Sequence, residues 1–275
     1  MIIQHNMTAA NTNRQLGITN NSLAKSTEKL SSGYRINRAG DDAAGLSISE
    51  KMRGQIRGLE QASTNAQDGI SLIQTAEGAM NEQHSILQRM RELSVQSAND
   101  TNTDTERTSI QEEITALTAE LTRIGDETEF NEKKLLKGDF SVAANALKFQ
   151  VGANAGQTIS VNIKDTRATA LISGGTVNVG TLTGATSAIT KIDNAIKSLS
   201  ATRSNLGSVQ NRLEHTIANA DNTAENLQAA ESRIRDVDMA KEMVSFSKDG
   251  ILQQAAQSML AQANQASQGV LSLLR

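Results

Sequence analysis

Residues 192–234 read IDNAIKSLSATRSNLGSVQNRLEHTIANADNTAENLQAAESRI. An apolar residue recurs at every seventh position of this segment, at Ile192, Leu199, Leu206, Leu213, Ala220, Leu227 and Ile234. A seven-residue spacing returns to the same side of an α-helix, so the segment predicts one continuous helix with an apolar stripe. At 1.5 Å per residue, such a helix is roughly 60 Å long. The pattern therefore predicts a mainly α protein shaped as an elongated rod of long antiparallel helices.

Two earlier segments carry the same helical spacing. Their apolar positions are Met52, Leu59, Ala66, Ile73, Met80 and Leu87 in the first segment, and Ile110, Ile114, Leu117, Leu121 and Ile124 in the second. A polar turn at residues 99–102 separates the two segments, and Thr103 with Glu106 three residues later has the capping-box signature of a helix start. We therefore expect the two segments to form an antiparallel hairpin.

Both ends of the chain carry narrower apolar stripes. Seven-residue spacing near the N-terminus joins Ile2, Ala9, Leu16, Leu23 and Leu30. A four-three repeat near the C-terminus, as in a coiled coil, comprises Leu252, Ala256, Met259, Ala263, Ala266, Val270 and Leu273. Ordering each residue costs about 1–2 kcal/mol of backbone entropy, which so thin a stripe does not offset alone. We expect the ends to pair with one another, or with copies of the chain, and to become ordered on assembly.

The apolar period changes to two in the middle of the chain. Leu147, Phe149 and Val151 alternate with polar residues, as do Ile159, Val161 and Ile163 after a Gly-containing loop. This alternation predicts a small β-hairpin near residues 140–165. The following segment, 166–185, is rich in Gly and Thr over much of its length, and we expect a short loop exposed at the outer surface.

Composition excludes several classes of protein. Aromatic residues make up 2% of the chain, and Pro and Cys are both absent, so helices are not interrupted by Pro and no disulfide or thiolate site exists. A formal net charge of −3 argues against nucleic acid as a partner. No apolar run is long enough for a membrane span, and the first residues do not resemble a signal peptide.

Candidate sites for enzymatic chemistry are weak. His5, His84 and His215 lie on separate helical segments without a second ligand at metal-binding spacing. Arg and Lys residues interrupt the acidic cluster at 231–238, which favours an ion-pair face. Residues 40–45 contain two Gly but lack the strand and the Gly-Lys-Ser/Thr of a phosphate loop, so a hinge is the better interpretation. The sequence predicts neither enzymatic activity nor a metal or other cofactor.

Several blocks of the chain resemble a known family, the bacterial flagellins. These blocks occur in flagellin order: LSSGYRINRAGDDAAGL at 30–46, QDGIS at 67–71, ILQRMRELSVQ at 86–96, LGSVQNR at 206–212, ESRIRDVD at 231–238, and ILQQ, LAQANQ and VLSLLR within 251–275. Three places depart from the family pattern: Tyr34 stands where Leu is usual, Glu132 where Gly is usual, and Ser-Gln-Gly at 267–269 where Pro-Gln-Asn is usual.

The resemblance implies a division of the chain and a function. Residues 1–45 and 235–275 would form a terminal helical domain at the filament core, and residues 46–165 with 186–234 a helical shell domain. Outer variable domains would be nearly absent. The chain would polymerise with itself through its terminal helices into the flagellar filament, which drives swimming.

The resemblance also implies partners and a location. An export chaperone would hold the C-terminal region, and the flagellar type III apparatus would secrete the unfolded chain to the extracellular filament. Filament cap and junction proteins would be further partners.

A host receptor is the last partner implied by the resemblance. The Toll-like receptor that senses flagellin contacts a motif matched here by Gln88, Arg89, Leu93, Gln96 and Glu113. Arg89 and Leu93 lie one turn apart on a helix, and an Arg beside an exposed Leu is typical of binding hot spots. The alternative interpretation is that this helix face makes contacts between subunits of the filament.

Two other functions fit parts of the sequence. A flagellar hook-filament junction protein would share the terminal helical pattern, but would match the terminal blocks alone. An adhesive surface module would use the loop at 173–184 as its binding surface.

Overall fold

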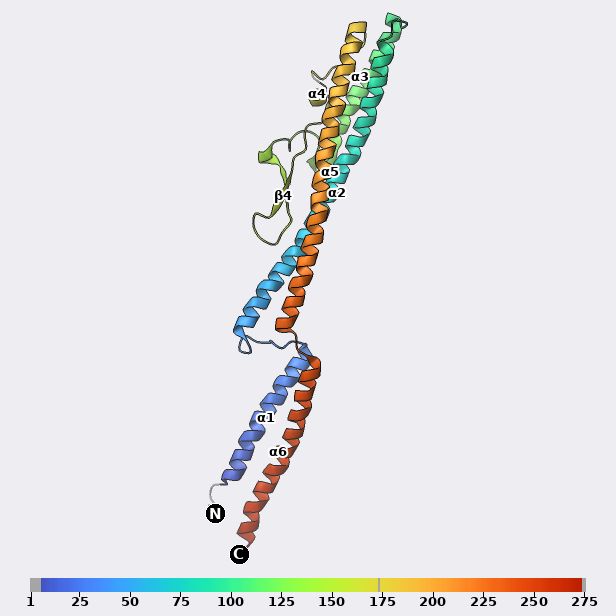
Figure 1. Ribbon diagram of the computed structural model, residues 1–275. Helices are drawn as coiled ribbons and strands as arrows, with labels where there is room; N and C mark the ends of the chain where they lie inside the picture. Colours follow the sequence, from blue (N-terminus) through green and yellow to red (C-terminus); the bar gives the residue numbers. More distant parts are fainter. Residues whose placement is uncertain (1–5, 173, 274–275) are drawn as a thin grey trace. The chain divides into compact units, whose positions relative to one another are not determined.

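The computed structural model describes residues 6–172 and 174–273, and side-chain burial through residue 266. The helices are α1 (Met7–Ser32), α2 (Ala43–Ser97), α3 (Asp104–Glu127), a 3₁₀ turn η1 (Ala143–Asn145), α4 (Ala168–Leu171), α5 (Leu182–Arg235) and α6 (Met239–Leu273). The strands are β1 (Glu129–Phe130), β2 (Lys133–Lys134), β3 (Leu147–Gln150) and β4 (Thr158–Val161) (Figure 1). The predicted mainly α fold with long helices and a small β-hairpin region is confirmed.

The chain folds into two compact units. Unit 1 comprises Met1–Gly54 and Glu225–Arg275, and unit 2 comprises Gln55–Ala224. The boundaries between these units fall inside α2 and α5, whereas the sequence places a boundary near residues 45 and 235. Both non-helical breaks, at 33–42 and 236–238, therefore belong to unit 1.

The core of unit 2 lies between α2, α3 and α5. The seven-residue stripe of α5 is buried at Ile192, Leu199, Leu206, Leu213 and Ala220, as its spacing predicts. Apolar side chains at the expected positions of α2 and α3 share this core, among them Ile73, Met80, Leu87, Ile114 and Leu121. Three stripes that meet in one core explain why these helices need no large aromatic residues to exclude water.

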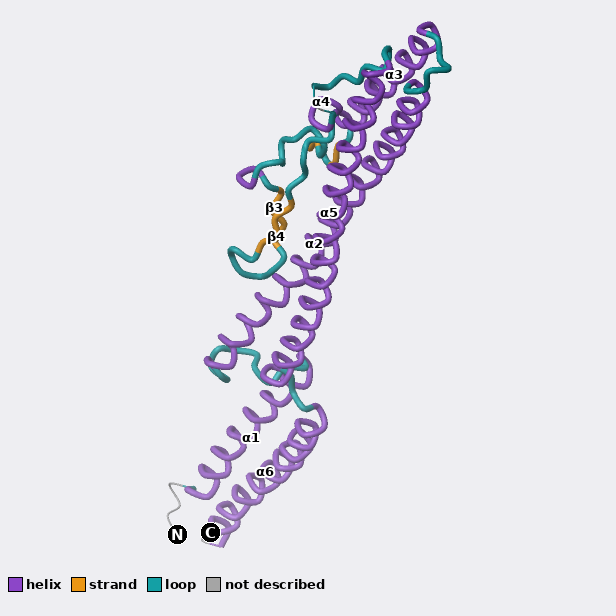
Figure 2. The backbone as a smooth tube through the Cα atoms, turned by 45° about the horizontal axis from the view of Figure 1, so that its top comes forward, coloured by secondary structure: helices purple, strands orange, loops and turns teal. Residues whose placement is uncertain are grey.

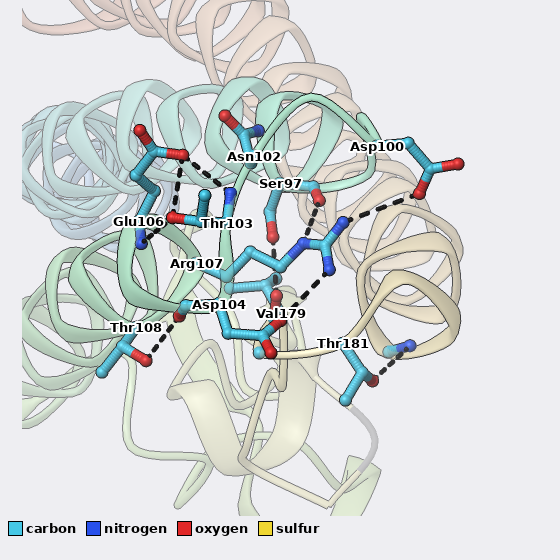
Figure 3. A network of polar contacts seen from close by, with 12 residues as sticks. Ser97, Asp100, Asn102, Thr103, Asp104, Glu106, Arg107, Thr108, Val179 and Thr181 are labelled. Carbon is cyan, nitrogen blue, oxygen red and sulfur yellow. Dashed lines mark hydrogen bonds and ion pairs between the residues drawn. The ribbon is translucent and has the colours of Figure 1, made fainter.

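Polar contacts close the turn between α2 and α3 (Figure 3). The capping box is present: the Thr103 hydroxyl accepts the Glu106 N–H, and the Glu106 carboxylate accepts the Thr103 N–H at 2.7 Å. The Arg107 guanidinium donates to the carbonyls of Ser97 at 3.2 Å and Asn99 at 3.3 Å. Because Arg107 of α3 donates to the carbonyl of the last residue of α2 and to one in the turn, it links the two helices.

Two short antiparallel hairpins follow α3 (Figure 2). In the first hairpin, Asn131 and Glu132 connect β1 to β2 with φ angles of 48° and 65°. A two-residue turn with both φ angles positive suits Gly at its second position, so Glu132 is strained there. In the second hairpin, Leu147 pairs with Val161 and Phe149 with Ile159, as the alternation predicts.

The second hairpin packs on α2 at glycine positions. A Cβ atom at Gly58 would lie 2.8 Å from the Cβ of Ala153, and one at Gly69 would lie 3.2 Å from the ring of Phe149. The Asn65 side chain donates to the Gln150 carbonyl at 3.2 Å. Glycine at these sites lets the hairpin approach the helix closely.

Segment 166–185 differs from the exposed loop expected from the sequence. It contains the short helix α4, and Ile172, Val177 and Val179 are buried against the unit 2 core. The Gln111 side-chain amide of α3 donates to the Val177 carbonyl at 2.8 Å and accepts the Val179 N–H at 2.7 Å. The Ser97 hydroxyl also donates to the Val179 carbonyl, at 2.6 Å. Alternate apolar side chains and these backbone contacts hold the segment to the helices despite its Gly and Thr content.

Candidate assembly interface

The terminal helices α1 and α6 form an antiparallel pair in unit 1 (Figure 1). Near the beginning of α1, Asn6 caps the helix by accepting the Ala9 N–H, and its Nδ2 donates to the Ala263 carbonyl at 3.0 Å. Midway along the pair, the Gln253 side chain donates to Asn20 Oδ1 at 2.8 Å. These polar contacts link one helix to the other across positions more than 230 residues apart in the sequence.

On α1, the face covered by α6 carries the predicted stripe. Leu16, Leu23 and Leu30 are all half-buried, with Thr19 and Ser26 between them on the same face. The stripe therefore mixes Leu with small polar side chains. Such a seam brings the helices together but buries little apolar area.

On α6, the face toward α1 carries only part of the predicted stripe. The half-buried positions recur at four-three spacing at Phe246, Asp249, Gln253, Ala256, Leu260 and Ala263. Of the predicted assembly residues, Ala263 belongs to this seam, whereas Leu252 and Met259 are exposed. The side chains of Val270 and Leu273 lie outside those described. The helix α6 has apolar residues on several sides, and their spacing alone cannot decide which side meets α1.

A second face of α6 remains uncovered. Val244 and Ile251, seven residues apart, lie opposite the seam and form this outer face, and four more exposed apolar side chains flank it: Met239, Met243, Leu252 and Met259. Val244 is 70% exposed and Ile251 68% exposed, more than half of each side chain's available surface. The outer face is thus more apolar than the seam with Asp249 and Gln253. Exposed large apolar side chains on one helix are typical of a surface that another protein chain covers.

The residues matched to the receptor motif lie on α2 and α3 of unit 2. Gln88, Arg89, Gln96 and Glu113 are exposed. The Arg89 guanidinium donates to Glu113 Oε1 through two nitrogens, at 3.1 Å and 3.0 Å, and this bond raises the pKa of Arg89. The structure therefore brings these two residues together from different helices.

Leu93 differs from its expected position. Its side chain is only 2% exposed and packs in the core of unit 2. The apolar stripe of α2 is broad, and its edge runs between these two neighbouring positions. Arg89 lies on the solvent side of that edge, and Leu93, one turn later, lies on the core side. The expectation of an exposed Leu beside Arg89 was wrong, and the accessible group is polar.

Sequence reasoning missed a cluster of side chains around Arg235. The Arg235 guanidinium lies 4.7 Å above the centre of the Tyr34 ring, and its Nη1 is 2.9 Å from Glu50 Oε1. This bond lowers the pKa of Glu50. The sequence around Arg235 does not indicate which side chains its guanidinium contacts, because Tyr34 and Glu50 are about 200 positions away in the sequence.

Other chemistry has little basis in the described parts. Within residues 6–172 and 174–273, no three His, Cys, Asp or Glu side chains gather as metal ligands would. His84 contacts Gln88 on its own helix, His215 lies on α5, and His5 lies outside the described residues. Among the described helices, none has the length and apolar content of a membrane span.

Comparisons with known proteins cover most of the sequence. Residues 3–141 match the model of the bacterial flagellin N-terminal helical region, and residues 189–274 match that of the bacterial flagellin C-terminal helical region. The first match includes all of α2 and α3, beyond the terminal blocks that a junction protein would share.

Relatives and solved structures agree with these matches. The flagellin of Halalkalibacterium halodurans is 57% identical over the whole of both chains, and that of Bacillus subtilis is 55% identical over the whole of both chains. The crystal structure of Bacillus cereus flagellin is 32% identical, covers 61% of this chain and 94% of its own, and has a TM-score of 0.51. A putative flagellar hook-associated protein from Vibrio parahaemolyticus shares the fold alone, at 13% identity and a TM-score of 0.59 over 71% of this chain and 100% of its own. This chain therefore belongs to the bacterial flagellin family, whose members are structural subunits of the flagellar filament.

Proposed function

We propose that this chain polymerises into the filament by packing the outer face of α6 against neighbouring copies, while α1 covers the opposite side. The observation that carries the proposal is the set of exposed apolar side chains on α6, centred on Val244 and Ile251. Full burial of one such side chain stabilises an interface by about 1.5–3 kcal/mol. Repetition of this contact between copies supplies a driving force for assembly.

The free subunit gives a further reason for this proposal. In the described part of unit 1, Ile36 is the only apolar side chain that is buried, and it lies outside both terminal helices. Ordering the two helices costs about 1–2 kcal/mol per residue, which their shared seam cannot offset. Contacts with copies would provide the missing apolar burial.

A charge placed on the outer face tests the proposal. We expect Ile251→Asp to prevent seeded polymerisation, measured by sedimentation and electron microscopy, because the interface would bury an unpaired carboxylate. Ile251→Leu keeps the apolar surface and serves as the matched control. Filaments of Ile251→Asp at the normal yield would contradict the proposal. Circular dichroism should show the helices of unit 2 intact in both variants, and also after deletion of residues 252–275, which should abolish polymerisation.

The exposed apolar face of α6 also supports a proposal about export. We infer that the chain is secreted to the extracellular filament by flagellar export, with a chaperone covering the C-terminal region and with cap and junction proteins meeting it at the filament ends. The exposed apolar face of α6 supports the chaperone, because such a face invites premature association. Loss of secretion on removal of 252–275, with secretion retained in Ile251→Leu, would support this inference, and full secretion of the truncated chain would contradict it.

Recognition by the host Toll-like receptor is a second candidate function. The proximity of exposed Arg89 and Glu113 on neighbouring helices supports it, together with exposed Gln88 and Gln96. We expect Arg89→Ala to reduce receptor signalling by unpolymerised subunits in a reporter assay, with exposed Arg53→Ala as the control. Undiminished signalling by Arg89→Ala would refute this site.

Residue Leu93 needs separate treatment in that assay. Leu93→Ala would create a cavity in the core of unit 2, so its effect on signalling would combine folding and contact. Only the polar positions give a clean test. If filaments signal as strongly as subunits, the patch is not covered by assembly.

A further inference from the structure

Unit 1 contains the two breaks that separate the terminal helices from the rest of the chain. Residues 33–42 follow α1, and residues 236–238 precede α6. The breaks pair with each other: the Arg35 N–H donates to the Arg235 carbonyl at 2.7 Å, and the Val237 N–H donates to the Gly33 carbonyl at 3.0 Å. Tyr34 and Asp236 face one another in this antiparallel bridge. The bridge is where the pairing of α1 with α6 starts.

Two guanidinium groups flank this bridge: the Arg35 Nε donates to the Ile234 carbonyl at 3.2 Å, and Arg235 makes the larger set of side-chain contacts. It is 16% exposed, its guanidinium covers the Tyr34 ring, and Nη1 bonds Glu50 of α2 at 2.9 Å. Glu231 lies one turn earlier on α5, with Oε1 3.9 Å from the same nitrogen. One guanidinium thus contacts the break after α1, the start of α2 and the end of α5. A planar cation can stack and donate at the same time, which Lys cannot do equally well.

The α1–α6 seam does not specify its own register strongly. Its buried and half-buried positions are small or polar at many steps, such as Thr19 and Ser26 on α1 and Asp249 and Ala256 on α6. A displacement of one helix by seven residues would place similar side chains opposite each other. A contact that fixes one end of the pair therefore decides which residues of α1 and α6 meet.

We propose that Arg235 is a positioning residue that sets the register of α1 against α6, and thereby the surface that α6 presents to a neighbouring copy. This inference rests on the proposed assembly through the terminal helices. Tyr34 is its stacking partner and Glu50 its anionic partner. Neither residue needs to touch a neighbouring copy for the register to depend on it.

Cysteine cross-linking tests the register, because the chain has no Cys of its own. Asn20→Cys with Gln253→Cys places thiols at positions whose side chains touch, and Asn13→Cys with Gln253→Cys is displaced by one heptad. The chains are incorporated as a minor component into seeded wild-type filaments and treated with a short bismaleimide. Cross-links within one chain are separated from those between chains by denaturing electrophoresis.

We expect the ratio of in-register to displaced cross-links to fall about tenfold in Arg235→Ala, which corresponds to about 1.4 kcal/mol. Tyr34→Phe keeps the aromatic face and should retain the ratio, whereas Tyr34→Leu should lower it. Exposed Arg233→Ala, two residues earlier on the same helix, is the matched control. Arg235→Lys should give an intermediate ratio.

Each outcome separates the two proposals. An unchanged ratio in Arg235→Ala, inside filaments that form normally, would overturn the positioning role and leave assembly through the terminal helices standing. Failure of the parent chain to polymerise at all would instead contradict the assembly proposal. Tyr34 fluorescence gives a second reading, since it is the only Tyr and Trp is absent. Acrylamide should quench Tyr34 more strongly in Arg235→Ala, and equal quenching would also overturn the inference.

Discussion

The two units use the same helical repeat but bury it to different extents. In unit 2, α5 contributes Leu199, Leu206 and Leu213 to the core, each with no exposed surface. In unit 1 the same helix continues with Leu227 and Ile234, which are only half-buried. Spacing is equal in both parts, so spacing does not explain the difference. Unit 2 has a third helix and a hairpin to close its core, whereas in unit 1 the main packing of the terminal helices α1 and α6 is on each other.

This difference indicates how one chain can be folded in one part and ready for assembly in another. A closed core supplies its own stability, whereas an open helix pair leaves apolar area for a partner. Unit 2 is the part that should keep its structure outside the filament. Unit 1 is the part whose stability should depend on concentration.

Core truncation in each unit should produce the largest contrast. We expect Leu213→Ala to lower the free energy of unfolding of the free subunit by about 2–5 kcal/mol, because it opens a cavity in unit 2. We expect Leu23→Ala, at a half-buried seam position of unit 1, to lower that free energy by less than about 1 kcal/mol. Both variants would be measured by urea titration followed by circular dichroism. Equal costs would contradict the view that only unit 2 carries the stability of the free subunit.

A smaller change of opposite sign should come from the strained turn in unit 2. Glu132→Gly should raise the free energy of unfolding by roughly 1 kcal/mol, because Gly adopts the positive φ of 65° without a Cβ clash. Asn131→Gly is the matched control and should gain less, since Asn tolerates this conformation. A loss of stability in Glu132→Gly would mean that the Glu side chain makes a contact worth more than the strain.

Acid should produce the smallest effect, and one of the carboxylates on which it acts is Glu50 of unit 1. The bond from Arg235 lowers the pKa of Glu50 in the folded chain below its ordinary value of 4.5. The stabilisation is therefore present above pH 4.5 and is lost as the pH falls through the lower folded value. Tyr34 fluorescence in filaments should change over this range, and Glu50→Gln should abolish much of the change.

The central helices show how much could be predicted from the sequence. The stripe of α5, the capping box at Thr103 and Glu106, and the hairpin that contains Phe149 and Ile159 were all predictable. Each depends on residues close together in the chain, where helical and strand periods limit the choices. The tight closing of the turn by Arg107 was not predictable, because its acceptors are backbone carbonyls.

The candidate surfaces were harder to predict. Leu93 was expected to be exposed and is buried, whereas Leu252 and Met259, expected to pair with the other terminal helix or with copies of the chain, are exposed in the single chain. A repeat states which residues share a side of a helix. It does not state which side another helix will cover, when several sides are apolar.

The spacing of apolar residues by itself determined the long helices and the hairpin of β3 and β4, and the resemblance of ordered sequence blocks indicated the family. Only the tertiary structure decided which faces are closed. Segment 166–185 became part of the core through Gln111 and Ser97, and Tyr34 met Arg235 across about 200 residues. The physical reason is that burial depends on what packs against a side chain, and those neighbours come from distant parts of the chain.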